Sequence, residues 1–166
     1  MEKYHSKTIQ IPVINQDGEP LGIIKKILIN FDKGKVIGFI IGRNKIISPI
    51  DIMTWEDYIK INNKDDIVSE TEIIEVKTYI KDKRKIIGSK VITEKGKLLG
   101  KVIDYTINSN FYSLEKLIVK KTFLKFIKFN KQIIPANEII EIKKNKIIVK
   151  EDTKDIKVGI MQTVAN

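Results

Sequence analysis

The 166-residue sequence contains no cysteine and only one histidine, His5. The lack of cysteine excludes disulfide bonds, thiolate metal sites and cysteine nucleophiles. One histidine offers no pair for a histidine-based metal site, and a lone histidine near a terminus is most often solvated. No apolar run approaches the roughly 18 residues that a transmembrane helix requires. These absences remove most thiol and metal chemistry.

The first residues and the composition predict the cellular compartment. Residues 1–5 lack the apolar core of a signal peptide. A hydrophobic fraction of 42% with 31% charged residues is typical of a folded, soluble protein. We therefore expect a cytoplasmic, prokaryotic protein whose length allows one mid-sized domain or two small ones.

The net charge of +10 is unevenly distributed along the chain. Residues 1–72 carry 10 Lys and Arg against 11 Asp and Glu, a balance of −1. Residues 73–166 carry 21 against 10, a balance of +11. Any affinity for RNA or for an anionic membrane surface is therefore expected in the second half.

The clearest feature that is present is an internal repeat. Residues 9–41 align without a gap on residues 87–119, 78 positions later. About three of the 33 pairs would be identical by chance in such a composition, but nine are. The identical pairs are Ile9/Ile87, Val13/Val91, Ile14/Ile92, Gly18/Gly96, Leu21/Leu99, Gly22/Gly100, Ile29/Ile107, Asn30/Asn108 and Ile40/Ile118. The sequence thus predicts two tandem units.

Each copy reads as a run of short strands. A first strand (9–14 or 87–92) precedes a turn that ends in glycine, and β-branched residues then dominate a second and a third strand. The predicted third strands are 36–41 and 114–119. Gly22 and Gly100 fall inside the second strands, which indicates a bulge or a sharp bend at a barrel corner.

The copies diverge after the third strand. The first crosses at 42–44 to residues 45–49, whereas the second reaches its equivalent, 131–135, after eight extra residues. A short turn or single helical turn (50–55; 136–140) and a last strand (66–68; 146–150) are predicted next. Residues 70–85 read as a short amphipathic helix or an extended linker.

These elements predict a mainly all-β fold: two small β-barrels related by the repeat, with short helical turns. The predicted boundaries are 1–72 for the first unit, 73–85 for a linker, 86–152 for the second unit and 153–166 for a tail.

The order of elements resembles the PRC-barrel family. The matching segments are GSKV (88–91), GKLLGKVID (96–104), LIV (117–119) and IPANEI (134–139), with weaker versions DGEPLGIIK (17–25) and ISPIDI (47–52). The resemblance implies a small β-barrel used as an interaction module. Similar domains form the cytoplasmic part of a photosynthetic reaction-centre subunit and the ribosome-facing half of a 16S rRNA maturation factor.

Two positions depart from the family pattern. The acidic residue after the first strand pair is Asp104 in the second copy but Lys26 in the first, and the frequent Asp that ends this strand is Asn30 and Asn108. The departures argue against a binding role shared across the family at these positions.

The strongest candidate binding segment is residues 120–131, which we call the Lys/Phe segment. It holds five lysines, three phenylalanines and no acidic residue, and its candidate binding residues are Lys120, Lys121, Phe123, Lys125, Phe126, Lys128 and Lys131. Lysines neutralise phosphates, and exposed rings stack on bases or enter a bilayer interface. The alternatives are a β-hairpin with buried rings and solvated lysines, or a partner-protein patch. Phenylalanines at every third position, 123 to 129, fit neither a strand face nor a helix face, which predicts at least one exposed ring.

Trp55 is a second candidate. It is expected to pack at a barrel rim or between the repeats, or to serve as a hot spot in a protein interface. The acidic residues around and after it, Glu56, Asp57, Asp65 and Asp66, match no EF-hand spacing and predict a solvated loop.

No arrangement in the sequence predicts catalysis. The paired glycines at 18 and 22, and at 96 and 100, lack the third glycine and the following helix of a phosphate-binding loop. No nucleophile–base pair stands out. The sequence therefore predicts a non-enzymatic adaptor without cofactor or metal that binds a partner protein. The alternative is RNA or anionic-surface binding through the basic second repeat.

Overall fold

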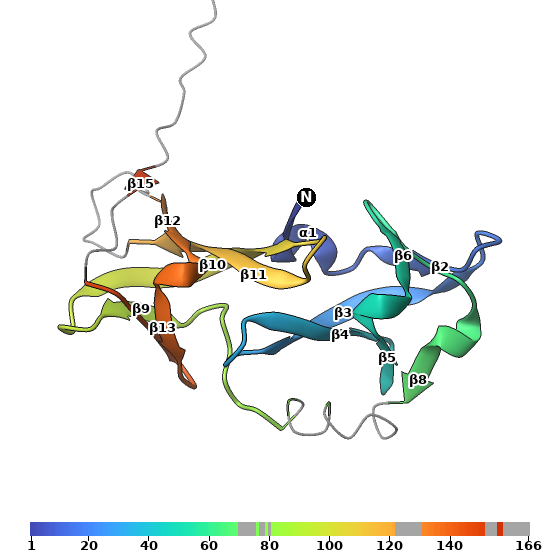
Figure 1. Cartoon of the computed structure of the whole chain (residues 1–166), viewed down its shortest axis with the longest axis horizontal. Helices are drawn as coiled ribbons and strands as arrows, with labels where there is room; N and C mark the ends of the chain where they lie inside the picture. Colours follow the sequence, from blue (N-terminus) through green and yellow to red (C-terminus); the bar gives the residue numbers. More distant parts are fainter. Residues whose placement is uncertain (70–75, 77–78, 80, 122–130, 152–155, 158–166) are drawn as a thin grey trace, which may run out of the picture. The chain divides into compact units, whose positions relative to one another are not determined.

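A computed structural model describes residues 1–69, 76, 79, 81–121, 131–151 and 156–157 (Figure 1). The described chain is mostly β-strand, joined by tight turns and a few short helical turns. Contacts between residues divide it into two compact units. The first comprises residues 1–84 and 105–115, and the second comprises residues 85–104 and 116–166.

The first unit has the strand order β6-β7-β2-β3-β4-β5-β8. It begins with β1 (Glu2–Tyr4), which pairs with the end of β10, and the one-turn helix α1 (His5–Thr8). The remaining elements are β2 (Pro12–Ile14), β3 (Pro20–Asn30), β4 (Lys35–Ile41), β5 (Lys45–Ile47), the 3-10 turn η1 (Pro49–Asp51), β6 (Ile52–Trp55), β7 (Ile59–Ile61), η2 (Lys64–Asp66) and β8 (Ile67–Ser69).

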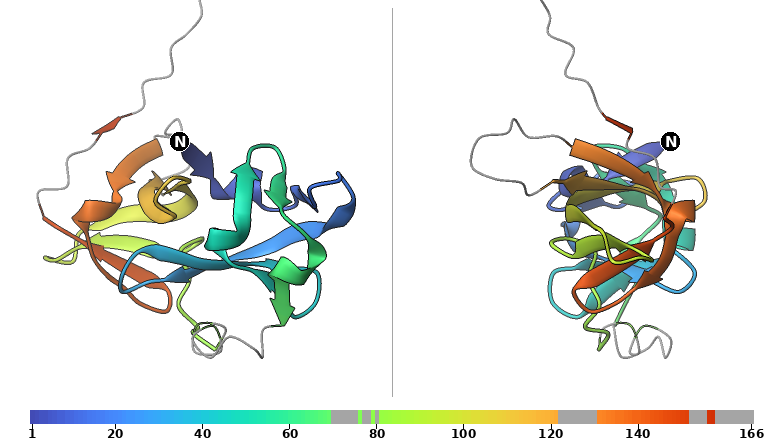
Figure 2. Two further views of the ribbon diagram at one scale, coloured as in Figure 1. Left: turned by 45° about the vertical axis from the view of Figure 1, so that its right-hand side comes forward. Right: turned by 90° about the vertical axis from the view of Figure 1, so that its left-hand side faces the viewer.

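The second unit has the strand order β13-β14-β9-β10-β11-β12-β15. Its elements are β9 (Lys90–Thr93), β10 (Leu98–Asn108), β11 (Ser113–Lys120), β12 (Lys131–Pro135), η3 (Ala136–Glu138), β13 (Ile139–Ile142), β14 (Lys146–Val149) and β15 (Ile156–Lys157). Residues 105–108 of β10 and 113–115 of β11 belong to the first unit. Adding seven to each strand number of the first unit gives this order. Each sheet curls into a half-barrel (Figure 2). The predicted tandem of small β-barrel units is confirmed.

The two copies keep the predicted register closely. Strands β3 and β10 begin and end 78 residues apart. The glycines at 22 and 100 have φ of 151° and 150°, and each pairs with the equivalent valine of the preceding strand. The ladder shifts register beside this pair in both units, so the expected bulge is present. Only glycine adopts such a backbone without strain.

A second bulge explains the irregular spacing of apolar residues in β3. Ile24, Ile27 and Ile29 are all buried, although they do not alternate strictly. The β3–β4 ladder shifts register between Ile24 and Lys26. A shift of one residue moves the side chains that follow to the opposite face of the sheet. Each buried isoleucine removes enough apolar surface from water to stabilise the fold by about 1.5–3 kcal/mol.

Equivalent residues of the two copies pair with each other inside the first unit. Lys35 of β4 pairs with Ser113 of β11, and these positions are 78 apart in the repeat. The Val36 N–H donates to the Tyr112 carbonyl at 2.7 Å, and the Leu114 N–H donates to the Gly34 carbonyl at 2.8 Å. The two hydrogen bonds are the same bond made twice, so the pairing has an approximate local two-fold symmetry.

Part of the secondary-structure prediction is wrong after the third strand. The predicted helical turns, 50–55 and 136–140, shrink to η1 and η3, and their remaining residues belong to strands β6 and β13. Strand β7 was not predicted, and the predicted last strand of the second copy is β14, the counterpart of β7. The 3-10 turns end early because alternating apolar residues continue directly into a paired strand.

Several predicted segments fall largely outside the described residues. Of the expected tail, only β15 is described, and it pairs with β12 as β8 pairs with β5. Most of the predicted helix or linker at 70–85 is not described. The unit boundaries 1–72, 73–85, 86–152 and 153–166 stay a prediction.

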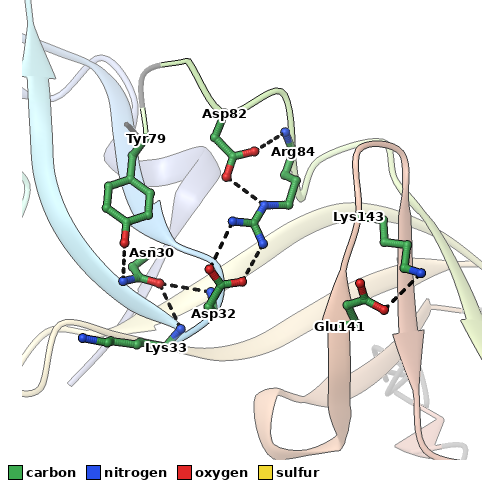
Figure 3. A network of polar contacts seen from close by, with 8 residues as sticks. All are labelled: Asn30, Asp32, Lys33, Tyr79, Asp82, Arg84, Glu141 and Lys143. Atoms are coloured by element: carbon green, nitrogen blue, oxygen red, sulfur yellow. Dashed lines mark hydrogen bonds and ion pairs between the residues drawn. The ribbon is translucent and has the colours of Figure 1, made fainter. Parts of the chain in front are cut away.

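The described residues after β8 contact the first unit closely (Figure 3). Val76 packs with Leu28 and Ile46 in a buried cluster. The Asn30 side-chain amide donates to the Tyr79 hydroxyl at 2.6 Å. Arg84 donates to the carboxylates of Asp82 and Asp32, with shortest distances of 2.7 and 2.6 Å. These four described residues therefore pack on or bond within the first unit.

Asn30 and Asn108, which are equivalent in the two copies, have a structural role. The Asn30 side-chain oxygen accepts hydrogen bonds from the N–H groups of Asp32 and Lys33. The Asn108 oxygen does the same for Asn110 and Phe111 in the equivalent turn. An asparagine caps such a turn by mimicking backbone geometry. The two positions are therefore explained by turn formation.

Candidate protein-binding groove

Trp55, the last residue of β6, lies in an aromatic cluster of the first unit. Its side chain is 7% exposed. Its ring meets the Phe39 ring edge-on, with centroids 5.0 Å apart, and stacks on the Tyr112 ring at 6.0 Å with an interplanar angle of 18°. Such pairs add about 0.5–1.5 kcal/mol beyond area burial. The cluster fixes the tryptophan firmly in place.

A cavity of about 250 Å³ opens beside this tryptophan, and we call it the Trp55 groove. Its lining residues are Met1, Ile52, Met53, Thr54, Trp55, Glu56, Ser109, Asn110 and Tyr112. Pockets for drug-sized ligands measure about 300–1,000 Å³. The smaller volume suits one or two side chains of a partner rather than an organic cofactor.

Exposed apolar side chains border the groove. Met1 is 72% exposed and Met53 is 54% exposed, and both line the cavity. Phe111, next to the lining residue Tyr112, is 69% exposed. Unbranched methionine side chains adapt to irregular partner surfaces. Large apolar side chains gathered at one exposed cavity indicate an interaction site.

Tyr112 adopts a strained backbone to reach this position. Its φ is 48°, in the left-handed region, and its counterpart in the first copy is Gly34 with φ of 63°. A residue with a side chain costs roughly 1–2 kcal/mol in this conformation. Burial also raises the pKa of the Tyr112 phenol. The chain thus tolerates strain at the one turn where the ring contacts Trp55.

The groove borders an acidic stretch of the first unit. Residues 51–66 contain five carboxylates against two lysines, a balance of −3. Glu56 lines the cavity, and the neighbouring Asp57 is exposed. Burial raises the pKa of Asp51, and the charge of Asp66 raises it further. A positive group is also near, because the Lys35 ammonium donates to the Phe111 carbonyl at 3.1 Å.

The predicted Lys/Phe segment is only partly described. Lys120 and Lys121 are half-buried, and Lys131 is exposed. Lys120 of β11 pairs with Lys131 of β12 in the second unit. The other candidate residues, Phe123, Lys125, Phe126 and Lys128, lie outside the described residues. Their binding role stays a prediction, as does the role of Trp55.

Sequence reasoning missed Tyr112 and the two methionines of the groove. The stacked pair joins residues 57 positions apart, and no local pattern predicts that contact. One signal for Tyr112 was available, because the repeat alignment places it opposite the turn glycine Gly34. A bulky residue at the position of a turn glycine indicates either that the turn is absent or that the backbone is strained, and strained residues cluster at functional sites.

Three buried polar side chains stand out in the described part of the chain. The Thr106 hydroxyl, one Glu115 oxygen and both amide atoms of Gln132 have no hydrogen-bond partner. Gln132 is 2% exposed. In the same part of the chain, no group of three or more histidine, aspartate or glutamate side chains gathers as metal ligands, and no helix has the length and apolarity to cross a membrane.

Two units of curled sheet with the same strand order define a tandem β-barrel protein. The model of the PRC-barrel domain family matches the sequence twice, over residues 1–77 and 81–156. The chain therefore belongs to the PRC-barrel domain family, in two tandem copies. This family has a non-enzymatic fold that often serves as an interaction module. No curated protein matches the chain.

Proposed function

We propose that the protein is a non-catalytic adaptor that binds a partner protein through the Trp55 groove. The observation that carries this proposal is the strained Tyr112 backbone, which supports a ring stacked on Trp55 at an open cavity. Strain at an exposed turn persists when the surrounding structure imposes it, and such positions cluster at binding sites.

The repeat provides an internal comparison for this groove. Strand β13 ends at Ile142, where β6 ends at Trp55, and the counterpart of Tyr112 is Gly34. The same fold therefore forms with neither aromatic residue at these two positions. Because barrel formation does not require the aromatic pair, a separate role for it in the first unit is favoured.

The chemistry of the groove suits a protein partner. Tryptophan and tyrosine are enriched among the residues that dominate interface energies, and they act from well-packed positions. Trp55 and Tyr112 are packed in this way, with exposed methionines beside them. A partner side chain that enters the cavity would contact a rigid aromatic wall and an adaptable rim.

The test uses residues that the chain itself accepts at equivalent positions. Affinity capture from the native cell with the unaltered protein is expected to recover a reproducible partner protein. The double variant Trp55→Ile, Tyr112→Gly is expected to lose that partner, whereas Ile103→Thr, at an exposed apolar residue of β10, is expected to keep it. Equal recovery by the double variant, or recovery of nucleic acid alone, contradicts the proposal.

A second candidate function, RNA or anionic-surface binding, is favoured by the exposed lysines of the second unit. These are Lys85, Lys90, Lys95, Lys97, Lys101, Lys131, Lys143, Lys144, Lys146 and Lys150. Binding through them would fall steeply with salt, because each neutralised phosphate releases counterions. The triple variant Lys121→Glu, Lys125→Glu, Lys128→Glu is expected to weaken RNA or anionic-vesicle binding. RNA or vesicle binding that does not fall as salt rises rules the second candidate out.

A further inference from the structure

We infer that the Trp55 groove accepts the Lys/Phe segment, residues 120–131, of a second copy of this chain. The inference rests on the proposed function, since it names the partner of the same groove. It joins two features of the molecule that the barrel fold leaves unexplained: an aromatic cavity in the first repeat and a basic, aromatic insertion in the second.

The apolar chemistry of the two surfaces matches. The groove offers aromatic rings and methionine side chains around a cavity of about 250 Å³. The segment carries three phenylalanines, Leu124 and Ile127 within twelve residues. A phenylalanine anchor in a small, preformed aromatic pocket is the usual core of a protein interface.

The charges of the two surfaces are opposite in sign. The segment has five lysines and no acidic residue, whereas residues 51–66 beside the groove have a balance of −3. Like charges lie close together there: burial raises the pKa of Asp51, and the nearby charge of Asp66 raises it further. Lysines placed near these carboxylates would relieve that repulsion. Lys35 reduces the negative potential locally but does not reverse the balance of the stretch.

The positions of the two features in the chain determine the kind of assembly. One copy carries the groove in its first repeat and the segment in its second, so a contact between two copies is head-to-tail. One such contact leaves a groove and a segment free, and these either meet reciprocally in a closed dimer or continue into larger rings or open chains. The balances of −1 and +11 in the two halves would steer this orientation during encounter.

The first experiment measures the mass of the full chain by sedimentation velocity from low to high micromolar concentration. We expect reversible self-association that weakens as salt rises, because lysine–carboxylate attraction is screened. A synthetic peptide of residues 120–131 is added as a competitor. The peptide contains no tryptophan, and Trp55 is the single tryptophan of the chain. Its fluorescence therefore reports occupation of the groove directly, and a scrambled peptide serves as control.

Two variants with equal charge change separate a specific contact from general attraction. Lys125→Glu, Lys128→Glu is expected to weaken self-association by about ten-fold or more. Lys101→Glu, Lys144→Glu alters exposed lysines outside the segment and is expected to have a much smaller effect. The groove variant Trp55→Ile, Tyr112→Gly is expected to abolish association, and circular dichroism verifies that each variant is folded.

Three results overturn this inference. A chain that stays monomeric at every concentration excludes the second copy, even where the free peptide quenches Trp55. If both double lysine variants weaken self-association equally, the association is a nonspecific electrostatic attraction and not a contact of the Lys/Phe segment. A monomeric chain whose groove variant still loses a captured partner protein overturns this inference and leaves the proposed function standing.

Discussion

Gln10 and Gly88 occupy the same position of the two repeats and share a left-handed backbone, with φ of 76° and 78°. The Gln10 N–H donates to the Ile24 carbonyl and the Gly88 N–H to the Val102 carbonyl, each at 2.8 Å. The fold therefore requires this conformation in both units. Glycine meets the requirement without strain, whereas glutamine does not.

The first prediction follows from this pair. Gln10→Gly should raise the free energy of unfolding by about 1 kcal/mol, because the left-handed conformation penalises a side chain. Gly88→Gln should lower the free energy of unfolding by a similar amount. Both positions are exposed, and a Cβ at Gly88 would meet no atom within 4 Å, so only the backbone strain changes. Urea denaturation measures both changes. A destabilised Gln10→Gly variant would show that the glutamine side chain stabilises the turn in another way.

A second pair of positions separates backbone strain from steric overlap. Gly22 and Gly100 have nearly equal φ, but the nearest atom to a Cβ at Gly22 is 3.8 Å away. A Cβ at Gly100 would overlap the Lys120 carbonyl oxygen and lie 2.9 Å from Val119. Gly22→Ala should therefore cost about 1–3 kcal/mol of strain, and Gly100→Ala should cost clearly more. Equal losses of stability in thermal denaturation would show that steric overlap adds nothing to backbone strain at Gly100.

The unpartnered Gln132 allows a reciprocal exchange. Ile46 of β5 serves as the comparison, because it is a fully buried apolar strand residue beside Leu28 and Val76. A buried amide without hydrogen bonds costs about 1–3 kcal/mol. Gln132→Ile should therefore raise the free energy of unfolding by that order, and Ile46→Gln should lower it by at least as much. If Gln132→Ile is destabilising instead, the amide has a partner such as a bound water.

The ion pair of Asp32 and Arg84 predicts a dependence on pH. The hydrogen bond from Arg84 lowers the pKa of the Asp32 carboxyl below its ordinary value of 3.8. The ionised form is therefore favoured in the folded state. Its stabilisation is present above the ordinary pKa and is lost as the pH falls through the lowered one.

Asp32→Asn should thus lower the melting temperature slightly at neutral pH, and the difference should vanish in acid. The effect is small and screened by salt, because the Asp32 side chain is 71% exposed. Asp17→Asn, which removes an exposed carboxylate at another turn, is the control. A difference that persists at low pH would exclude the ion pair as its cause.

Much of the fold could be predicted because both copies of the repeat carry the same turn residues at the same spacing. Turn glycines such as Gly18 and Gly96, and apolar runs between them, set strand limits that the structure keeps at the same spacing of 78 residues. Strands β6 and β13 were missed because each has only four residues and follows directly on a 3-10 turn, so its alternation of apolar residues is too short to recognise. Their strand pairing depends on partners elsewhere in the sheet.

The groove was harder to predict, because its parts come from distant stretches of the chain. Trp55 was selected from its residue type alone, but its contact with Tyr112 depends on how the third-strand turn of the second copy completes the first unit. The contacts of Val76, Tyr79 and Arg84 have the same origin. Local propensity carries no information about such long-range contacts, and only the assembled structure brings them together.

The pairing of Lys35 with Ser113 has a consequence for the ancestry of the protein. A position that pairs with its own duplicate satisfies the same hydrogen bonds when two identical single-repeat chains meet across a true symmetry axis. Fusion of their genes would convert that dimer contact into an intramolecular one, which then forms at any dilution. The duplicated halves became free to diverge, because neither had to remain self-complementary.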